Sequence, residues 1–306
     1  MTTAPSPARP VVTYLRSLRQ PGWPILALPI VYVAMIAYIG DIRPEHIVIV
    51  VVTLGAWLAS HITRDIMREA LPALPIAIGF DSLRYLRPIF VTADRVHACD
   101  LRAFELALFG VGPDMTLPDY FAIHHAPAFD LFFAIPYAAF IWVLIVYGFS
   151  LYFRNLERGR VCAWAVVGVF MTAFIVWMAF PAAPPWYIQA HGCVIDASLG
   201  TNPAALTRVD EALGIQYFQA WYGRGPTAFG AMPSVHNGLA MLGLLVFWPI
   251  AGTKERIANV LYVVWMLCAS IYLDHHWLVD ALAGWATAAM AVKLGEYWTG
   301  WKRRAE

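Results

Sequence analysis

Two short stretches place a histidine at the start of an expected helix. The first, Pro233-Ser234-Val235-His236, precedes a long apolar run. Proline cannot continue a helix backwards, so we expect a helix to begin here with Ser234 as its N-cap. The free backbone N–H groups of a helix start form an anion site. His236 would then lie beside any phosphate bound there and could exchange protons with it.

The second stretch, His276 to Asp280, pairs a histidine with an aspartate four residues later. Residues i and i+4 share one helix face, so Asp280 could accept a hydrogen bond from one ring nitrogen of His276. That bond would fix the tautomer and leave the other nitrogen free for nucleophilic attack. His275 would point about 100° away and lack such a partner. The pattern predicts covalent catalysis by His276.

Each motif alone is common, because a histidine at a helix end is more often an ordinary interface residue. A zinc site built from His236, His276 and Asp280 is a further interpretation. However, the HxxxH and CxxC spacings from which zinc sites usually begin do not occur in the sequence. Both motifs together, each before an apolar run, favour a catalytic pair.

The elements that carry the motifs are expected to be membrane helices. Hydrophobic residues make up 60% and charged residues 13% of the 306 residues, whereas soluble domains have roughly half and a quarter. The net charge of +1 gives no indication of nucleic-acid binding. We predict an all-α, polytopic membrane bundle of about eight transmembrane helices. The expected spans are residues 24–40, 46–60, 71–83, 131–153, 161–180, 237–251, 257–273 and 278–298.

These spans suggest two parts and an orientation. We divide the chain into a tail with two helices, residues 1–70, and a catalytic six-helix membrane domain, residues 71–306. With eight spans the basic clusters all fall on one side, which the positive-inside bias makes cytoplasmic. Both histidine motifs then lie on the non-cytoplasmic side. We expect a multi-pass integral membrane protein with its active site there.

Two long segments are expected on that same side. One, residues 84–130, contains a short interfacial helix at 102–111; the other, residues 181–236, shows no helical period and is long enough to suggest function. Cys99 and Cys193 fall in these two segments. Two interpretations stay open for them: a disulfide between the two, or two free thiols. Cys162 and Cys268 lie in apolar runs and are interpreted as small buried residues.

Four stretches carry a more specific pattern. They read FPAAPPWY (180–187), NPAALTRVDEALG (202–214), FGAMPSVHNG (229–238) and YLDHHWLVD (272–280). Together they resemble the membrane branch of the type 2 phosphatidic acid phosphatase superfamily. The closer likeness is to its fungal inositol phosphorylceramide synthases, the targets of aureobasidin A. The resemblance covers residues 104–284.

The resemblance implies that His276 attacks phosphorus to form a phosphohistidine while Asp280 orients it. His236 would protonate the leaving alcohol and then deprotonate the acceptor. In the synthases phosphoinositol moves from phosphatidylinositol to ceramide, and neither a metal nor an organic cofactor is needed. A diacylglycerol or polyprenol acceptor stays open.

Two other functions stay open as alternatives. With water as the acceptor, the same histidines would make a lipid or polyprenyl phosphate phosphatase. A non-enzymatic transporter or lipid-binding scaffold is a third alternative, which the paired motifs disfavour. An apolar, aromatic loop that excludes water favours transfer over hydrolysis.

The sequence also departs from the superfamily pattern. The Ser-Arg pair that often precedes the second histidine is replaced by Ala269 and Ser270, so the phosphoryl oxygens lack that cation. Asp210 is expected either to pair with Arg208 or to bind a headgroup, and Trp186 is assigned to an aromatic belt. The candidate substrate-binding residues are Ser234, Arg84, Arg208, Asp210 and Arg224.

Overall fold

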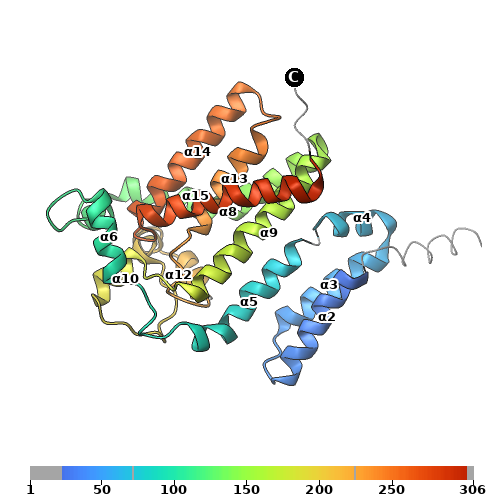
Figure 1. Ribbon diagram of the computed structural model, residues 1–306, viewed down its shortest axis with the longest axis horizontal. Coiled ribbons are helices and arrows are strands. Elements are labelled where there is room, and N and C mark those ends of the chain that lie inside the picture. The colour runs from blue at the N-terminus through green and yellow to red at the C-terminus, as the bar shows by residue number, and fades with distance from the viewer. Residues whose placement is uncertain (1–22, 71, 224, 302–306) are drawn as a thin grey trace, which may run out of the picture. The chain divides into compact units, whose positions relative to one another are not determined.

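The computed structural model describes residues 23–70, 72–223 and 225–301. Within these residues the chain is helical, and only isolated bridges occur in place of strands. This confirms the all-α prediction. The chain forms two compact units that divide between Ile78 and Gly79 (Figure 1). The domain boundary expected after residue 70 stays a prediction.

The first unit contains α2 (Trp23–Tyr38), α3 (Pro44–Ala59) and α4 (His61–Ala70). The turn between α2 and α3 passes through Gly40, whose φ of +80° favours glycine. The sequence analysis did not predict α4, which is polar and follows α3 directly. Arg64 of α4 is buried, and its Nε donates to the Trp57 carbonyl at 3.2 Å.

The second unit is a bundle of long helices (Figure 1). Helix α15 packs against α9 and α13, while α8 and α14 both contact α13. A further helix, α5, begins in the first unit and ends in the second. The bounds of these helices are α5 Ala73–Phe90, α8 Pro127–Arg154, α9 Leu156–Ala179, α13 Val235–Phe247, α14 Thr253–Tyr272 and α15 Leu278–Thr299.

Small residues let the central helices approach closely, as is common in membrane bundles. A Cβ added at Gly168 of α9 would lie 3.0 Å from the Cβ of Ala291 in α15. Further along the same contact, a Cβ at Gly295 would lie 3.0 Å from the Val161 carbonyl oxygen. The backbones of α9 and α15 are therefore in near contact along their length.

Three of the described helices, α8, α9 and α15, are long and apolar enough to cross a bilayer. Three shorter helical stretches are also apolar: α3, α13 and the part of α2 from residue 27 to residue 38. Each of the eight predicted spans coincides with a helix, although the number of crossings stays a prediction. The chain is an integral membrane protein. Helix α13 has 13 residues and is about 20 Å long, shorter than a hydrocarbon core of about 30 Å.

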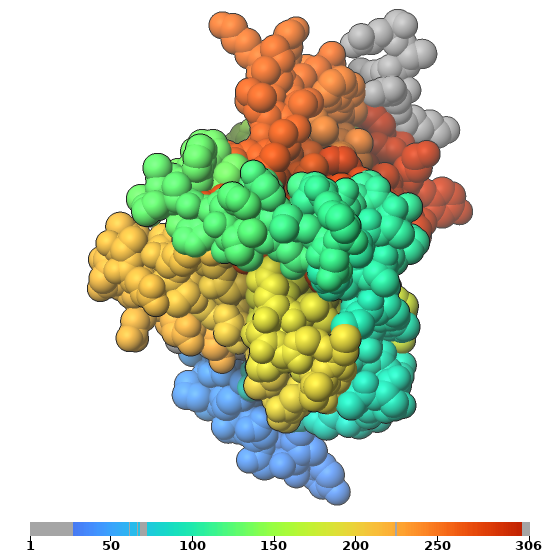
Figure 2. All heavy atoms as spheres, turned by 90° about the vertical axis from the view of Figure 1, so that its left-hand side faces the viewer, coloured from blue at the N-terminus to red at the C-terminus, as the bar shows by residue number. Residues whose placement is uncertain are grey.

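Two segments cover the end of the bundle where α13 and α15 begin. The first holds α6 (Cys99–Phe109) and α7 (Leu117–Ile123). The second holds α10 (Pro185–His191), η1 (Ala204–Leu206), α11 (Thr207–Leu213) and α12 (Tyr217–Tyr222). Figure 2 shows the first segment in teal to green beside the second in yellow to gold.

Residues 181–236, which show no helical period in the sequence, nevertheless contain short helices. Proline and glycine divide this segment into helices of one or two turns, which are too short to produce a visible 3.6-residue period. Helix α10 begins at Pro185, and α11 ends at Leu213, with Gly214 as its C-cap at a φ of +65°.

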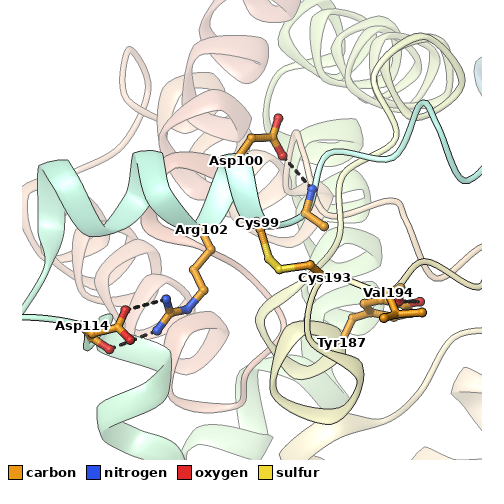
Figure 3. The surroundings of a disulfide bond; sticks show 8 residues. Cys99, Asp100, Arg102, Asp114, Tyr187, Cys193 and Val194 are labelled. Atoms are coloured by element: carbon orange, nitrogen blue, oxygen red, sulfur yellow. Dashed lines mark hydrogen bonds and ion pairs between the residues drawn. A yellow bond between two sulfur atoms is a disulfide. The ribbon is translucent and has the colours of Figure 1, made fainter.

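A disulfide joins the two segments, between Cys99 and Cys193 (Figure 3). It ties the first residue of α6 to the turn that follows α10. Arg102, one turn further along α6, donates to Asp114 at 2.8 Å and to Asp119 at 2.9 Å. Helix α6 is therefore fixed by a covalent bond and by two ion pairs.

Candidate active site

Helix α13 begins as the PSxH motif predicts. Ser234 is its N-cap, and the Ser234 hydroxyl accepts from the backbone N–H of Asn237 at 3.3 Å and from the Asn237 amide at 3.1 Å. His236 is the second residue of the helix. Its ring stacks on Tyr137 of α8 with 4.4 Å between ring centroids, which fixes the plane of the imidazole.

His276 lies two residues before α15, whose N-cap is Trp277. The expectation that His276 and Asp280 share one helix face is therefore wrong, because the chain turns before the helix begins. The two side chains still meet, with 3.7 Å between His276 Nδ1 and Asp280 Oδ2. Asp280 Oδ2 also accepts from the Trp277 N–H at 2.9 Å.

The His276 ring lies close to Asp280 without a hydrogen bond between them. Its Nδ1 and the second carboxylate oxygen of Asp280, Oδ1, are buried without a hydrogen-bond partner. The other ring nitrogen, Nε2, donates to the Ala231 carbonyl. Burial lowers the pKa of His276 to about 4, so the ring is neutral at physiological pH. A closer approach of Nδ1 to Asp280 would select the tautomer that carries its proton on Nδ1, as hydrogen bonds in active sites often tighten only with substrate.

The starts of α13 and α15 are brought together by their backbones. The Ser234 N–H donates to the Asp280 carbonyl at 3.0 Å. A Cβ at Gly284 would collide with the Ser234 carbonyl oxygen, and a Cβ at Gly238 would lie 3.2 Å from the Gly284 carbonyl oxygen. This close approach leaves 5.9 Å between the ring centroids of His236 and His276.

Both histidines line one cavity of about 400 Å³. Its walls are largely aromatic and apolar, with a few hydroxyl and amide groups. Trp186 is part of this wall, rather than only part of an aromatic belt. The aromatic wall residues beside the histidines are Phe80, Trp177, Trp186, Trp221 and Tyr222.

His275 lines the same cavity, and the sequence analysis gave it no role. Its ring is stacked between Tyr137 and Tyr222, at centroid distances of 5.0 and 4.8 Å. The direction expected for the His275 side chain, 100° from His276, applies only within a helix. Helix α15 begins at Leu278, so neither histidine belongs to it. Two adjacent histidines before a helix were the available signal.

The proposed substrate-binding residues are not gathered around this cavity. Ser234 is buried as the N-cap, and Arg84 pairs with Asp81 at 3.1 Å within α5. Neither residue lines the cavity. Arg224 lies outside the described residues, although its neighbour Gly225 lines the cavity.

Arg208 and Asp210 each have other partners, so the suggested pair between them is wrong. Arg208 donates to Asp130 at 2.8 and 3.0 Å, beside a separate cleft of about 430 Å³. Asp210 is buried and accepts from the backbone N–H groups of Phe218 and Gln219 at the start of α12. Asp210 therefore holds α12, whose last residues reach the cavity.

Comparison with known proteins agrees with this arrangement. The chain matches the PAP2 superfamily over residues 110–294. It is 30% identical over 281 residues to a phosphoinositol dihydroceramide synthase of Bacteroides thetaiotaomicron, covering 89% of this chain and 90% of that protein. It is 28% identical over 249 residues to the inositol phosphorylceramide synthase catalytic subunit of Schizosaccharomyces pombe, covering 77% and 55%.

A third relative, the inositol phosphorylceramide synthase of Candida albicans, is 35% identical over 112 residues, which are 36% of this chain and 23% of that protein. No solved structure matches the chain. The family match includes both histidine motifs, and the bacterial relative aligns over nearly its whole length. The chain therefore belongs to the PAP2 superfamily, as an enzyme of the inositol phosphorylceramide synthase type.

Proposed function

We propose that the chain transfers a phosphoinositol-type headgroup from a phospholipid such as phosphatidylinositol to the hydroxyl of a ceramide-like lipid. The observation that carries this proposal is the cavity that His236 and His276 line together. The activities for which the relatives are named suggest the headgroup and the acceptor class.

The chemistry would proceed in two displacements at phosphorus. His276 Nε2 attacks phosphorus, the bond from phosphorus to the diacylglycerol oxygen breaks, and His236 protonates that oxygen. The lipid hydroxyl then attacks the phosphohistidine, gives its proton to His236 and releases His276. Once Nδ1 has closed on Asp280, the carboxylate accepts the Nδ1–H and stabilises the positive charge that the ring acquires.

The walls of the cavity favour a lipid alcohol over water as the second nucleophile. Indole and phenyl rings surround the histidines, so water has few partners in the cavity, whereas an alkyl chain packs well there. Hydrolysis by the same residues, which would make the chain a lipid phosphatase, is the alternative.

We place the active site on the non-cytoplasmic side. The histidine motifs lie where α13 and α15 begin, whereas the basic residues Arg154, Lys254 and Arg256 lie at the opposite ends of the neighbouring helices. The disulfide on the histidine side supports an oxidising compartment there.

Purified protein in detergent would be given phosphatidylinositol with ceramide, with diacylglycerol or with water alone, and the lipids analysed by mass spectrometry. We expect a new inositol-phosphate lipid that requires ceramide and disappears in His276→Ala. Release of inositol phosphate independent of any acceptor would instead identify a phosphatase. Unchanged transfer by His276→Ala would refute the mechanism.

A further inference from the structure

A buried glutamate from a distant part of the chain holds the start of α15. Glu105 of α6 is fully buried. Its Oε1 accepts from the Leu278 N–H at 2.9 Å, and its Oε2 accepts from the Val279 N–H at 3.1 Å. These two N–H groups belong to the first residues of α15 and lie between His276 and Asp280 in the chain.

Helix α15 needs this external partner because its own N-cap does not supply one. The first N–H groups of a helix lack intrahelical acceptors and usually receive one from the N-cap side chain. Trp277 cannot accept, and its indole N–H donates to the Ala183 carbonyl at 2.9 Å. Asp280 satisfies the Trp277 N–H, and Glu105 satisfies the next two.

Packing alone does not account for a glutamate in this position. Burying a carboxylate costs free energy, and an apolar side chain of similar size would fill the space at lower cost. Burial raises the pKa of Glu105, the two N–H bonds lower it, and the nearby charge of Asp280 raises it. Two carboxyl groups therefore share the positive end of one helix.

We propose that Glu105 is a positioning residue that sets the Asp280 carboxylate against His276. By holding the N–H groups of Leu278 and Val279, Glu105 fixes the helix turn from which Asp280 projects. The separation of 3.7 Å between His276 Nδ1 and Asp280 Oδ2 must close during the reaction. This inference rests on the proposed roles of His276 and Asp280.

The position of Glu105 is itself fixed by the contacts that hold helix α6. The disulfide holds Cys99 at the first residue of α6, and Arg102 ties the next turn to Asp114 (Figure 3). Arg102 also donates to Asp119. Glu105 follows Arg102 by three residues on the same helix. Through Glu105, the disulfide-linked segments therefore hold the first residues of α15, beside His276 and Asp280.

The test is a double-mutant cycle of Glu105→Gln and Asp280→Asn, with kcat and both lipid KM values measured for transfer. Glutamine has the size of glutamate, but its NH₂ group is a donor. One N–H group of α15 would therefore face a donor where glutamate presents an acceptor. We expect Glu105→Gln to lower kcat by roughly 10- to 100-fold with KM unchanged. In the Asp280→Asn background the same change should have little further effect, because its action passes through Asp280.

The matched control is Glu255→Gln, the same substitution at the start of α14, where Glu255 accepts from the Gly252 N–H at 2.9 Å. It should keep kcat. A Glu105→Gln protein that melts earlier but keeps the kcat of the parent per folded molecule would overturn the inference. Fully additive losses in the cycle would overturn it too.

If Glu105→Gln yields no folded protein, Glu105→Asp carries the same cycle, since aspartate keeps the charge but reaches less far. The outcome for His276→Ala separates this inference from the proposed function. An inactive His276→Ala with a fully active Glu105→Gln refutes only the positioning role. An active His276→Ala refutes the function on which that role depends.

Discussion

Gly284 sets how closely α13 and α15 approach at the catalytic end of the bundle. A Cβ added there would collide with the Ser234 carbonyl oxygen and would lie 3.2 Å from the Gly238 nitrogen, whereas ordinary contacts begin at 3.4 Å. Both obstructing atoms are backbone atoms of α13 or of its N-cap, so no side-chain rotation can relieve the overlap. In Gly284→Ala one helix start must move away from the other.

The size of the expected effect follows from that movement. Relief of the overlap requires a shift of roughly 1 Å between His236 and the pair of His276 and Asp280, and such a shift can lower a rate about 100-fold. Overpacking costs about 1–3 kcal/mol, and alanine regains about 1 kcal/mol of helix propensity relative to glycine. We therefore expect a large loss of activity with a modest loss of stability.

The assay compares transfer rate and thermal unfolding for the parent, Gly284→Ala and Gly148→Ala. Gly148 lies in α8, six residues before its end, and a Cβ there would meet no atom within 4 Å. Gly148→Ala should therefore keep the parent's rate. Gly284→Ala protein with full activity and an unchanged melting temperature would refute the argument that this glycine sets the separation of the two histidines.

Burial lowers the pKa of His276 to about 4. Because the neutral ring attacks, we expect kcat/KM to fall on the acid side near pH 4 rather than near pH 6.5. A pH–rate profile at limiting donor concentration tests this. Burial raises the pKa of Asp274 to about 7 despite its bond to Gln189, so the folded protein loses stability as pH rises from the ordinary value of 3.8 through 7. Asp274→Asn should then raise the melting temperature more at pH 8 than at pH 5, and an equal shift at both pH values would contradict this. Cys99 and Cys193 are 94 residues apart, so replacing both by serine should cost about 2–4 kcal/mol, seen as a lower melting temperature that reductant no longer changes.

The features that the sequence predicted well depend on local patterns. The long apolar runs gave the helices of the bundle, and the order Pro-Ser-x-His gave the N-cap of α13. The four stretches of resemblance indicated the family that the comparisons confirm. Helix α4 was missed because it is short and polar, and such a helix has no apolar run to mark it.

The partners of the site depend on contacts that span many residues of the chain. Glu105 is 173 residues from Leu278, and no spacing within one helix connects them. Asp210 appeared to be a partner of Arg208 because the two are close in sequence, yet Asp210 accepts backbone N–H groups of α12 and Arg208 pairs with Asp130. Charge signs in a loop do not decide which of several nearby groups will pair.

The disulfide between Cys99 and Cys193 also constrains how the protein is made. Helices α8 and α9 lie between the two cysteines, and the thiols can meet only when both have reached the same face of the bilayer. During synthesis the bond can therefore close only after α9 has followed α8 across the membrane. In a variant whose free cysteines Cys162 and Cys268 are replaced by serine, reaction of Cys99 with a maleimide of high mass would mark chains in which this hairpin has not finished inserting.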